Sequence, residues 1–206
     1  MRKTPRQARS RRTVERIIAA GREVLLEDGY DAFSTNRVAA AAGVSPGSLY
    51  QYFPDKGAIL DEVIDRYWEE VTERVAASLA DRIGETGPAM VRDAADALLA
   101  ALEADRPLLR VVAEELPATR HKARRAKLEV RVRELMTAYL AGRPEATHRP
   151  EPAVTAWTLV LALENVALHY VLDEPGIDRD RVVAEMVALV GGYLSVPDPP
   201  RSAGSS

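Results

Sequence analysis

The sequence predicts an all-α fold on three observations. Apolar residues recur at helical spacing through most of the 206-residue chain, and no stretch has the alternation of a strand. Glycine and proline gather at the ends of these periodic stretches. Hydrophobic residues make up 47% of the chain, enough for a sizeable core. We expect about nine helices, with three short N-terminal ones sharing the start of a fourth with a larger C-terminal bundle.

Capping residues and helix breakers bound the three N-terminal helices. Ser34 and Ser45 are placed to cap the second and third helices with their side-chain oxygens. Gly29 and Gly43 are placed to end the first and second. The expected ranges are 14–28, 35–42 and 46–53.

The C-terminal bundle is expected to begin with a long helix that Asp55 can cap and that carries an apolar stripe as far as Val75. Further helices are expected at 89–104, 105–117, 119–141, 153–172 and 178–194. Residues 142–152 read as a linker because of their proline and glycine content. The resulting divisions are 1–56, which includes a basic arm; 57–196, the helical bundle; and 197–206, a disordered tail.

Composition excludes several classes of protein. The chain has no cysteine, which rules out disulfides and cysteine metal sites and fits a reducing cytosol. No apolar run approaches the length of a membrane span, and no signal-peptide apolar region follows the basic N-terminus. We therefore expect a soluble, cytoplasmic protein with no membrane partner.

Charge is distributed unevenly along the chain. Residues 1–56 carry ten Lys/Arg against six Asp/Glu, whereas the remainder carries 18 against 25. The first thirteen residues hold six basic side chains and no acid. A basic arm of this kind often contacts nucleic acid, although a solvated tail has the same composition. Both interpretations stay open at this point.

Residues 35–53 have the spacing of a helix-turn-helix. The turn AGVS (42–45) contains a glycine, which suits the left-handed conformation that ends the first helix. On a helical wheel, Leu49 and Phe53 share one face and should anchor the second helix, whereas Gly47 and Gln51 point the opposite way. The outward face is polar, slender and free of acids. Such a helix fits the major groove of DNA.

Lys56 stands at the start of the fourth helix, where the helix dipole disfavours a cation. A DNA phosphate shared between the lysine and the helix N-terminus would explain the placement. The alternative is a solvated lysine that tolerates about a few tenths of a kcal/mol of repulsion.

The segment STNRVAAAAGVSPGSLYQYFPDKGAIL (34–60) resembles the N-terminal domain of the TetR/AcrR family of bacterial transcriptional repressors. The matching elements are the Thr35 start, the AGVS turn, the Gly-Ser-Leu-Tyr run, Tyr52-Phe53, and Lys56 followed by Ile59-Leu60. The rest of the chain is similar to the family in length, helicity and layout. The resemblance implies that 1–56 is a basic arm and helix-turn-helix DNA-binding domain and that 57–196 is a ligand-binding and dimerisation domain.

The resemblance implies a homodimer that places two recognition helices in a near-palindromic operator, and an unidentified small-molecule effector that releases it. By position, phosphate contacts are implied for Thr35, Tyr50, Tyr52 and Lys56. Positions at or near base edges are implied for Asn36, Gly47, Ser48 and Gln51. Arg37 and Ser45 are also assigned to the DNA-binding surface. Family members often have arginine where this chain has Asn36, so either Asn36 or Arg37 could reach DNA.

The resemblance also assigns residues to an effector pocket and a dimer interface. The pocket candidates lie on helices that surround the ligand cavity in the family: Tyr67, Trp68, Met90, Leu98, Leu102, Arg110, Leu135 and Tyr139. The interface candidates lie on the last two helices: Trp157, Asn165, His169, Val183, Met186, Val187, Val190 and Tyr193. Asn165 and His169 share a helix face and could instead line the pocket, but we favour the interface.

Two other functions compete with a ligand-responsive repressor. An enzyme is disfavoured because the chain lacks cysteine and a phosphate-binding loop and its three histidines are scattered, so neither cofactor nor metal is expected. A helical DNA-binding or architectural protein without an effector is the second alternative. A cavity of about 300 Å³ or more with a few polar groups would favour an effector. Repression is the expected mode, with activation as its alternative.

Overall fold

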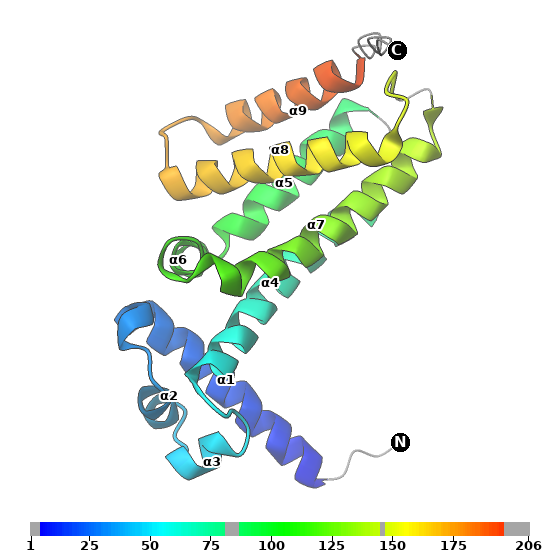
Figure 1. Ribbon diagram of the computed structural model, residues 1–206. Coiled ribbons are helices and arrows are strands. Elements are labelled where there is room, and N and C mark those ends of the chain that lie inside the picture. The colour runs from blue at the N-terminus through cyan, green and yellow to red at the C-terminus, as the bar shows by residue number, and fades with distance from the viewer. Residues whose placement is uncertain (1–4, 81–86, 145–146, 196–206) are drawn as a thin grey trace, which may run out of the picture. The chain divides into compact units, whose positions relative to one another are not determined.

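The computed structural model describes residues 5–80, 87–144 and 147–195, and within them it is helical with no strand (Figure 1). The all-α prediction is confirmed for this part of the chain. The elements are α1 (Pro5–Ala32), α2 (Thr35–Ala41), α3 (Pro46–Tyr50), α4 (Lys56–Ala80), α5 (Pro88–Glu103), α6 (Arg106–Arg110), the π-helical turn η1 (Val111–Glu115), α7 (Ala118–Ala141), α8 (Pro152–Asp173) and α9 (Arg179–Ser195).

Helix α1 begins earlier than its apolar spacing predicts. The basic stretch expected as an arm ahead of the folded domain is helical from Pro5 onward, while residues 1–4 lie outside the described part. The predicted stop at Asp28-Gly29 is confirmed, because Gly29 has φ 74° and ψ 176°, outside helical values. The label α1 continues across this kink to Ala32.

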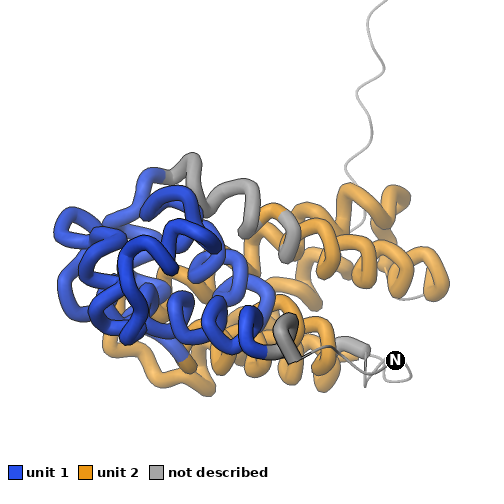
Figure 2. Tube along the Cα trace, turned by 90° about the horizontal axis from the view of Figure 1, so that it is seen from below, with its two compact units in different colours: residues 1–70, 105–125 blue, residues 71–104, 126–206 orange. Residues whose placement is uncertain are grey.

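Two compact units make up the chain (Figure 2). Unit 1 comprises Met1–Glu70 and Asp105–Arg125, and unit 2 comprises Val71–Ala104 and Ala126–Ser206. Neither unit is one continuous stretch, because the 105–125 segment groups with the N-terminal helices. The predicted domain limit after residue 56 stays a prediction, and the predicted tail at 197–206 lies outside the described residues.

Unit 1 has an apolar core supplied by α1, α2, α3 and the first part of α4. Its fully buried side chains include Ile17, Leu25, Leu49, Ile59, Leu60 and Ile64. Helices α1 and α4 approach closely at Gly21, where an added Cβ would lie 2.8 Å from Cγ2 of Ile59. The small residue there therefore permits the close approach of α1 and α4 in the core of unit 1.

The segment that contains α6 and η1 is fastened to α1 by polar contacts. The guanidinium of Arg22 donates to Asp105 at 2.6 Å, and the backbone N–H of Tyr30 donates to Oε2 of Glu115 at 3.2 Å. Gly29 suits this approach, since its φ is positive and an added Cβ would lie 3.3 Å from the Glu115 carboxylate. These contacts explain why a segment distant in sequence belongs to unit 1.

The π-helical turn at Val111–Glu115 was not predicted. The sequence predicts one helix over 105–117, whereas the structure divides it into α6 and η1. The turn closes with the Leu116 N–H donating to the Val111 carbonyl at 3.2 Å, one residue further back than in an α-helix. Leu116 is then extended ahead of Pro117, as residues before proline prefer.

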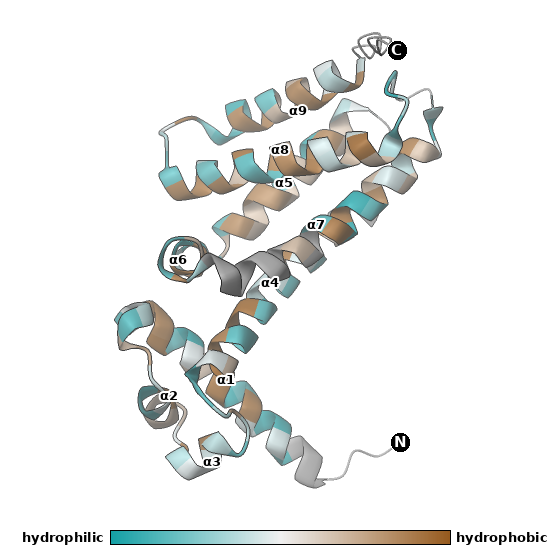
Figure 3. Ribbon diagram, in the orientation of Figure 1, coloured by the Kyte–Doolittle hydropathy of each residue, from teal (hydrophilic) through white to brown (hydrophobic). Residues whose placement is uncertain are grey.

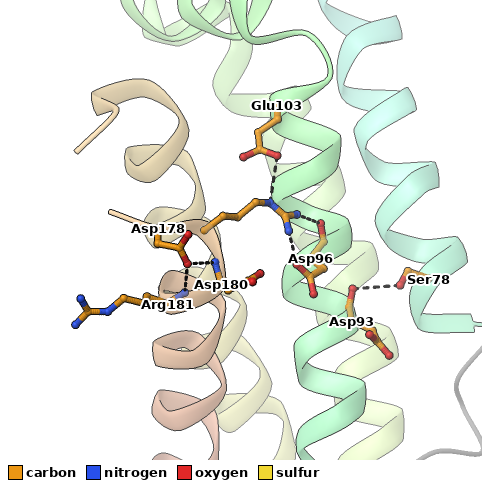
Figure 4. A network of polar contacts seen from close by, with 8 residues as sticks. Ser78, Asp93, Asp96, Glu103, Asp178, Asp180 and Arg181 are labelled. Carbon is orange, nitrogen blue, oxygen red and sulfur yellow. Dashed lines mark hydrogen bonds and ion pairs between the residues drawn. The ribbon is translucent and has the colours of Figure 1, made fainter. Parts of the chain in front are cut away.

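Unit 2 packs α5 against α8 and α9, and apolar residues recur along all three helices (Figure 3). A polar network joins α9 to α5 (Figure 4). Arg179 donates to Oδ1 of Asp96 at 2.6 Å and lies 3.4 Å from Oε2 of Glu103. Oδ1 of Asp178 accepts the backbone N–H of Asp180 at 3.0 Å, which caps the first turn of α9.

Helix α8 departs from the expectation that no apolar run approaches a membrane span. By length and composition alone, Pro152–Asp173 could cross a membrane. Within unit 2 the helix packs against α5 and α9, and its Glu164 is buried at 5% exposure.

Candidate nucleic-acid interface

The turn between α2 and α3 is built around Gly43. This glycine has φ 62°, and its N–H donates to the Ala40 carbonyl while that of Val44 donates to the Ala39 carbonyl. The pair of bonds is the Schellman arrangement, which ends a helix with a left-handed residue. The predicted role of the glycine is confirmed, and the turn fixes the direction in which α3 leaves α2.

Helix α3 is capped at its start and anchored from behind. Oγ of Ser45 accepts the N–H of Ser48 at 3.2 Å and donates to the Ser48 hydroxyl at 2.9 Å. Leu49 is fully buried and Phe53 is 8% exposed, so one face of the segment is fixed in the core of unit 1. At Gly47 an added Cβ would meet nothing within 4 Å. The opposite face is therefore open and slender at its N-terminal end.

Two hydroxyl groups predicted to contact phosphates lie together at the edge of this face. Tyr50 is 52% exposed, and its hydroxyl is 3.1 Å from Oγ1 of Thr35 at the start of α2. Gln51 is exposed and Tyr52 is half-buried. The sequence contains no Asp or Glu from 34 to 54, so this surface has no fixed negative charge of its own. The arrangement is compatible with a polyanionic partner.

Asn36 and Arg37 differ in how the fold holds them. A guanidinium nitrogen of Arg37 forms an ion pair with Asp28, near the end of α1. The hydrogen bond to that carboxylate, followed by its charge, raises the pKa of Arg37 above the usual value. Asn36 is exposed on the first turn of α2 and carries no charge. The structure thus separates two positions that sequence alone leaves equivalent.

Lys56 has partners within unit 1. Its Nζ donates to the Phe33 carbonyl at 3.2 Å and lies 5.3 Å from the centroid of the Tyr30 ring. Asp55 caps the same helix by accepting the N–H of Ala58 at 2.9 Å. These contacts stabilise the ammonium at a helix N-terminus without any phosphate. The placement of Lys56 is therefore not by itself a sign of DNA, although the side chain remains exposed.

A second candidate site is an apolar cavity of about 60 Å³ inside unit 2. Helices α4, α5, α7 and α8 supply its described lining: Val75, Ala94, Ala95, Leu98, Glu129, Val132, Met136, Val160, Leu163 and Glu164. A larger groove of about 430 Å³ lies among α5, α7 and α9 in the same unit. Met136 lines both spaces.

The predicted pocket residues are not gathered at this cavity. Of the eight, Leu98 is among the lining residues, whereas Met90 and Tyr139 line the groove. Leu102 is buried at 1% exposure and Leu135 is half-buried, and neither is among the residues that line the cavity.

Tyr67, Trp68 and Arg110 belong to unit 1. The rings of Tyr67 and Trp68 meet edge to face with centroids 5.1 Å apart. The Tyr67 hydroxyl is buried without a hydrogen-bond partner, and burial, helped by the charge of Asp105, raises the pKa of Tyr67. Nε of Arg110 lies 3.9 Å from Oε1 of Glu114, one turn further along the chain.

Sequence reasoning missed Glu129 and Glu164 as lining residues. Glu164 was visible as an acid amid an apolar helix, which is a signal for a buried site. Glu129 lies in a strongly basic stretch, and nothing in the sequence sets it apart. Among the described residues, no group of three or more His, Asp and Glu is placed to hold a metal ion.

The predicted dimer residues divide into buried and exposed sets. Val183, Met186 and Val190 are buried within their own unit, at 1%, 2% and 3% exposure. Val187 and Tyr193 are half-buried, whereas Trp157 is 51% exposed. Fewer of the eight predicted interface residues are therefore available to a partner than the sequence suggests.

Asn165 and His169 each have a hydrogen-bond partner on their own helix. The Asn165 amide donates to the Leu161 carbonyl at 2.7 Å, and Nδ1 of His169 is 3.1 Å from Oδ2 of Asp173. Neither residue is among those that line the cavity. The alternative that they form the effector pocket has no support from this geometry, and the interface assignment stays a prediction.

Two family models match the chain. Residues 17–63 match the model of bacterial regulatory proteins of the tetR family, and residues 86–194 match the model of the tetracyclin repressor-like C-terminal domain. The first match contains α2, the turn and α3, and the second covers more than half of the chain.

Curated relatives match the chain in part. The transcriptional regulator CymR of Pseudomonas putida is 40% identical over 72 residues, which are 35% of this chain and 36% of CymR. Relatives at 36–42% identity are matched over 20–41% of their own length.

Solved structures match nearly the whole fold. A TetR-family regulator from Mesorhizobium loti has a TM-score of 0.71 at 20% identity, covering 90% of this chain and 96% of that one. FadR from Bacillus subtilis, in complex with stearoyl-CoA, has a TM-score of 0.64 at 16% identity, covering 85% and 96%. At these identities the likeness concerns the fold. With both family models matched in order, the chain belongs to the tetR family of bacterial regulatory proteins.

Proposed function

We propose that the protein is a ligand-responsive transcriptional repressor that binds a near-palindromic operator as a homodimer. The observation that carries the DNA-binding part is the outward face of α3. It is polar, free of acids and open at Gly47, while Leu49 fixes the opposite face in the core. A helix held in this way can enter a major groove without being displaced from its own domain.

Specific contacts follow from exposure and from the partners of each side chain. Thr35, Tyr50, Tyr52 and Lys56 are proposed to contact phosphates, and Asn36, Gly47, Ser48 and Gln51 to lie at or near base edges. Between Asn36 and Arg37 we assign the base contact to Asn36, because Arg37 is engaged by Asp28. Ser45 is proposed to act mainly by capping α3.

Selection of bound DNA from a random pool at fixed salt tests this proposal most directly. The expected result is a pseudo-palindrome whose half-sites are separated by about one or more helical turns of DNA. In the selected site, Gln51→Ala should change base preference, whereas Tyr50→Phe should weaken binding to all sequences alike. Recovery of no enriched sequence, or of a site without two-fold symmetry, would contradict the proposal.

The homodimer is proposed to form through α8 and α9. Val154, Trp157 and Leu189 are 52%, 51% and 43% exposed, an unusual display of large apolar side chains on two neighbouring helices. Leu189→Glu should convert a dimer to a monomer in sedimentation measurements, because a charge would be buried without a partner. Val130→Glu is the matched control, since Val130 is 39% exposed but lies on α7. A dimer that survives Leu189→Glu unchanged would exclude this seam.

The groove and the cavity of unit 2 support the proposal that a small-molecule effector binds the protein. The groove of about 430 Å³ is of the size that small molecules use, whereas the cavity of about 60 Å³ alone is smaller. That small cavity favours, as a second candidate, a DNA-binding protein without an effector. Release of the selected operator by a small molecule, measured by fluorescence anisotropy, distinguishes the two.

A further inference from the structure

We propose that an arginine stripe on the first turns of α1, made of Arg9, Arg12 and Arg16, is a second DNA-contacting surface that binds phosphates of the duplex. The inference rests on the proposed function for its partner, and it adds a surface outside the helix-turn-helix. The three side chains are exposed, and their spacing of three and four residues places them on one face of the helix. The stripe therefore presents three guanidinium groups in one direction.

The arginines of unit 1 divide into those that the fold neutralises and those that it does not. Those with interaction partners are Arg22, Arg37, Arg66, Arg106 and Arg110. The other arginines of unit 1 whose side chains are described are the three of the stripe and Arg11, which lies on another side of the helix. Within the described part of the chain, these four guanidinium groups form no ion pair or hydrogen bond. The uncompensated positive charge of unit 1 is therefore concentrated between residues 9 and 16.

The acid nearest to the stripe is engaged elsewhere. Residues 5–22 contain one acid, Glu15, and its Oε1 accepts a hydrogen bond from Arg66 at 3.0 Å. Arg12 and Arg16 stand four residues apart, a spacing at which two like charges destabilise a helix. Lys56 also stands where a cation is disfavoured, but contacts within unit 1 stabilise it. The stripe has no such contacts among the described residues, and a bound polyanion would replace its repulsion with attraction.

The position and length of the stripe fit a DNA backbone. Arg9 and Arg16 lie about 10 Å apart along the helix axis, which is comparable with about three phosphate spacings of one DNA strand. The beginning of α1 and the recognition helix α3 lie at the same end of unit 1 (Figure 1). Because this part of α1 is helical, the guanidinium groups are held in a fixed direction and not on a flexible arm.

An anionic membrane carries the same kind of charge, but it binds helices that also have an apolar face to bury. The apolar residues between 5 and 16 are Pro5, Ala8 and Val14, which do not form a continuous stripe. Ile17 and Ile18, which come next, are buried in the core of unit 1 and are not available to lipid. The surface therefore fits DNA better than a bilayer.

The test replaces the stripe in the full-length protein with Arg9→Gln, Arg12→Gln and Arg16→Gln together. Affinity for the selected operator and for a random-sequence duplex is measured by fluorescence anisotropy over a range of salt. The slope of log affinity against log salt should fall by about 2 to 3 for each bound subunit, because each lost phosphate contact contributes about 0.9. Affinity at about 0.1 M salt should fall at least about tenfold, and by the same factor for both duplexes, since phosphate contacts carry no sequence information.

The matched control is a second triple variant with the same change in net charge. Arg74→Gln, Arg92→Gln and Arg181→Gln remove three exposed arginines of unit 2 and should leave the salt slope unchanged. An equal fall in the slope of this control would show a non-specific effect of net charge and overturn the proposal.

A structural role of the stripe is separated from DNA contact by two further measurements. The triple glutamine variant should melt at the same temperature as the parent or slightly higher, because like charges are removed. Replacing the same three arginines with lysine should restore most of the salt slope, because lysine also neutralises a phosphate. A lower melting temperature together with an unchanged slope would show that the stripe stabilises the fold and would refute DNA contact.

The stripe and the operator proposal can fail separately. If no sequence is selected, but the slope on random-sequence duplex falls in the triple glutamine variant, the stripe stands and operator recognition fails. If an operator is selected and its salt slope is unchanged in the variant, the regulator stands and the stripe fails. The stripe also fails as a DNA surface if the variant binds DNA like the parent but loses binding to vesicles of phosphatidylglycerol and phosphatidylcholine.

Discussion

The outward face of α3 and the cavity of unit 2 are built in opposite ways. The face is made by consecutive residues, 45–53, held by one cap and two buried anchors. The cavity takes its largely apolar lining from four helices that are distant in sequence. A surface made by one continuous segment depends on the sequence of that segment. The shape and lining of a cavity depend on every helix that contributes to it. The difference teaches that recognition of DNA and recognition of a small molecule can diverge independently on one chain.

Truncation of a core leucine in either unit should have the largest effect on the free energy of unfolding. Leu49 and Leu99 are both fully buried, one in unit 1 and the other in unit 2. Either Leu→Ala change should lower the free energy of unfolding by about 2–5 kcal/mol, measured with urea. Under conditions where both variants stay folded, only Leu49→Ala should weaken binding to the selected DNA. Equal loss of DNA binding in Leu99→Ala would break the separation of the two regions.

Gly43, in the turn, and Gly47, on α3, allow a comparison within the helix-turn-helix. At neither position would an added Cβ have an atom within 4 Å. Gly43→Ala should cost about 1 kcal/mol of stability, since φ at this residue is 62°. Gly47→Ala should leave stability unchanged or raise it by up to about 1 kcal/mol, as alanine does in a helix. Its operator affinity should nevertheless fall by about tenfold, because the methyl group would project from the outward face. Thermal unfolding and anisotropy separate these outcomes, and unchanged affinity in Gly47→Ala would remove this residue from the interface.

Lys56→Ala tests whether an intramolecular partner and a phosphate can share one ammonium. The variant should reduce the slope of log affinity against log salt by about 1, the value for a single phosphate contact. Arg181→Ala is the control, because Arg181 is an exposed cation on α9 in unit 2. If the salt dependence of affinity were unchanged in Lys56→Ala, Lys56 would contact only Phe33 and Tyr30 and no phosphate.

The smallest expected effect concerns pH. The hydrogen bond from Arg66, with its charge, lowers the pKa of Glu15 below its usual value of 4.5. A depressed pKa contributes stability that is present above the unfolded value and is lost as the pH falls through the folded value. Glu15→Gln should therefore lower the melting temperature slightly at pH 7, and the difference from the parent should shrink in strong acid. Exposed ion pairs contribute only about 0–1 kcal/mol, so Glu69→Gln, an exposed carboxylate on the same helix as Arg66, is measured beside it.

Local sequence signals predicted most of the helices and the helix-turn-helix at 35–53. Serine caps, the glycine of the AGVS turn and the proline at the start of α3 act within a few residues, so they are legible in sequence. The π-helical turn was not legible, because it depends on how η1 packs against α1. Glu164 stands out in the sequence as an acid among apolar residues, but its position at a cavity could not be predicted, since most of its neighbours there come from other helices. The early start of α1 escaped prediction because its first turns are polar and lack apolar periodicity.

The bond from the Tyr30 amide to Glu115 bears on the exchange of DNA-binding heads between family members. The residues that hold the end of α1 come from a segment 85 positions later in the chain. A chimera that transplants residues 1–70 alone would leave the Tyr30 amide and Arg22 facing whatever the recipient carries in place of Glu115 and Asp105. The transplantable part is therefore two segments, and a designer would move 105–125 together with the N-terminal helices.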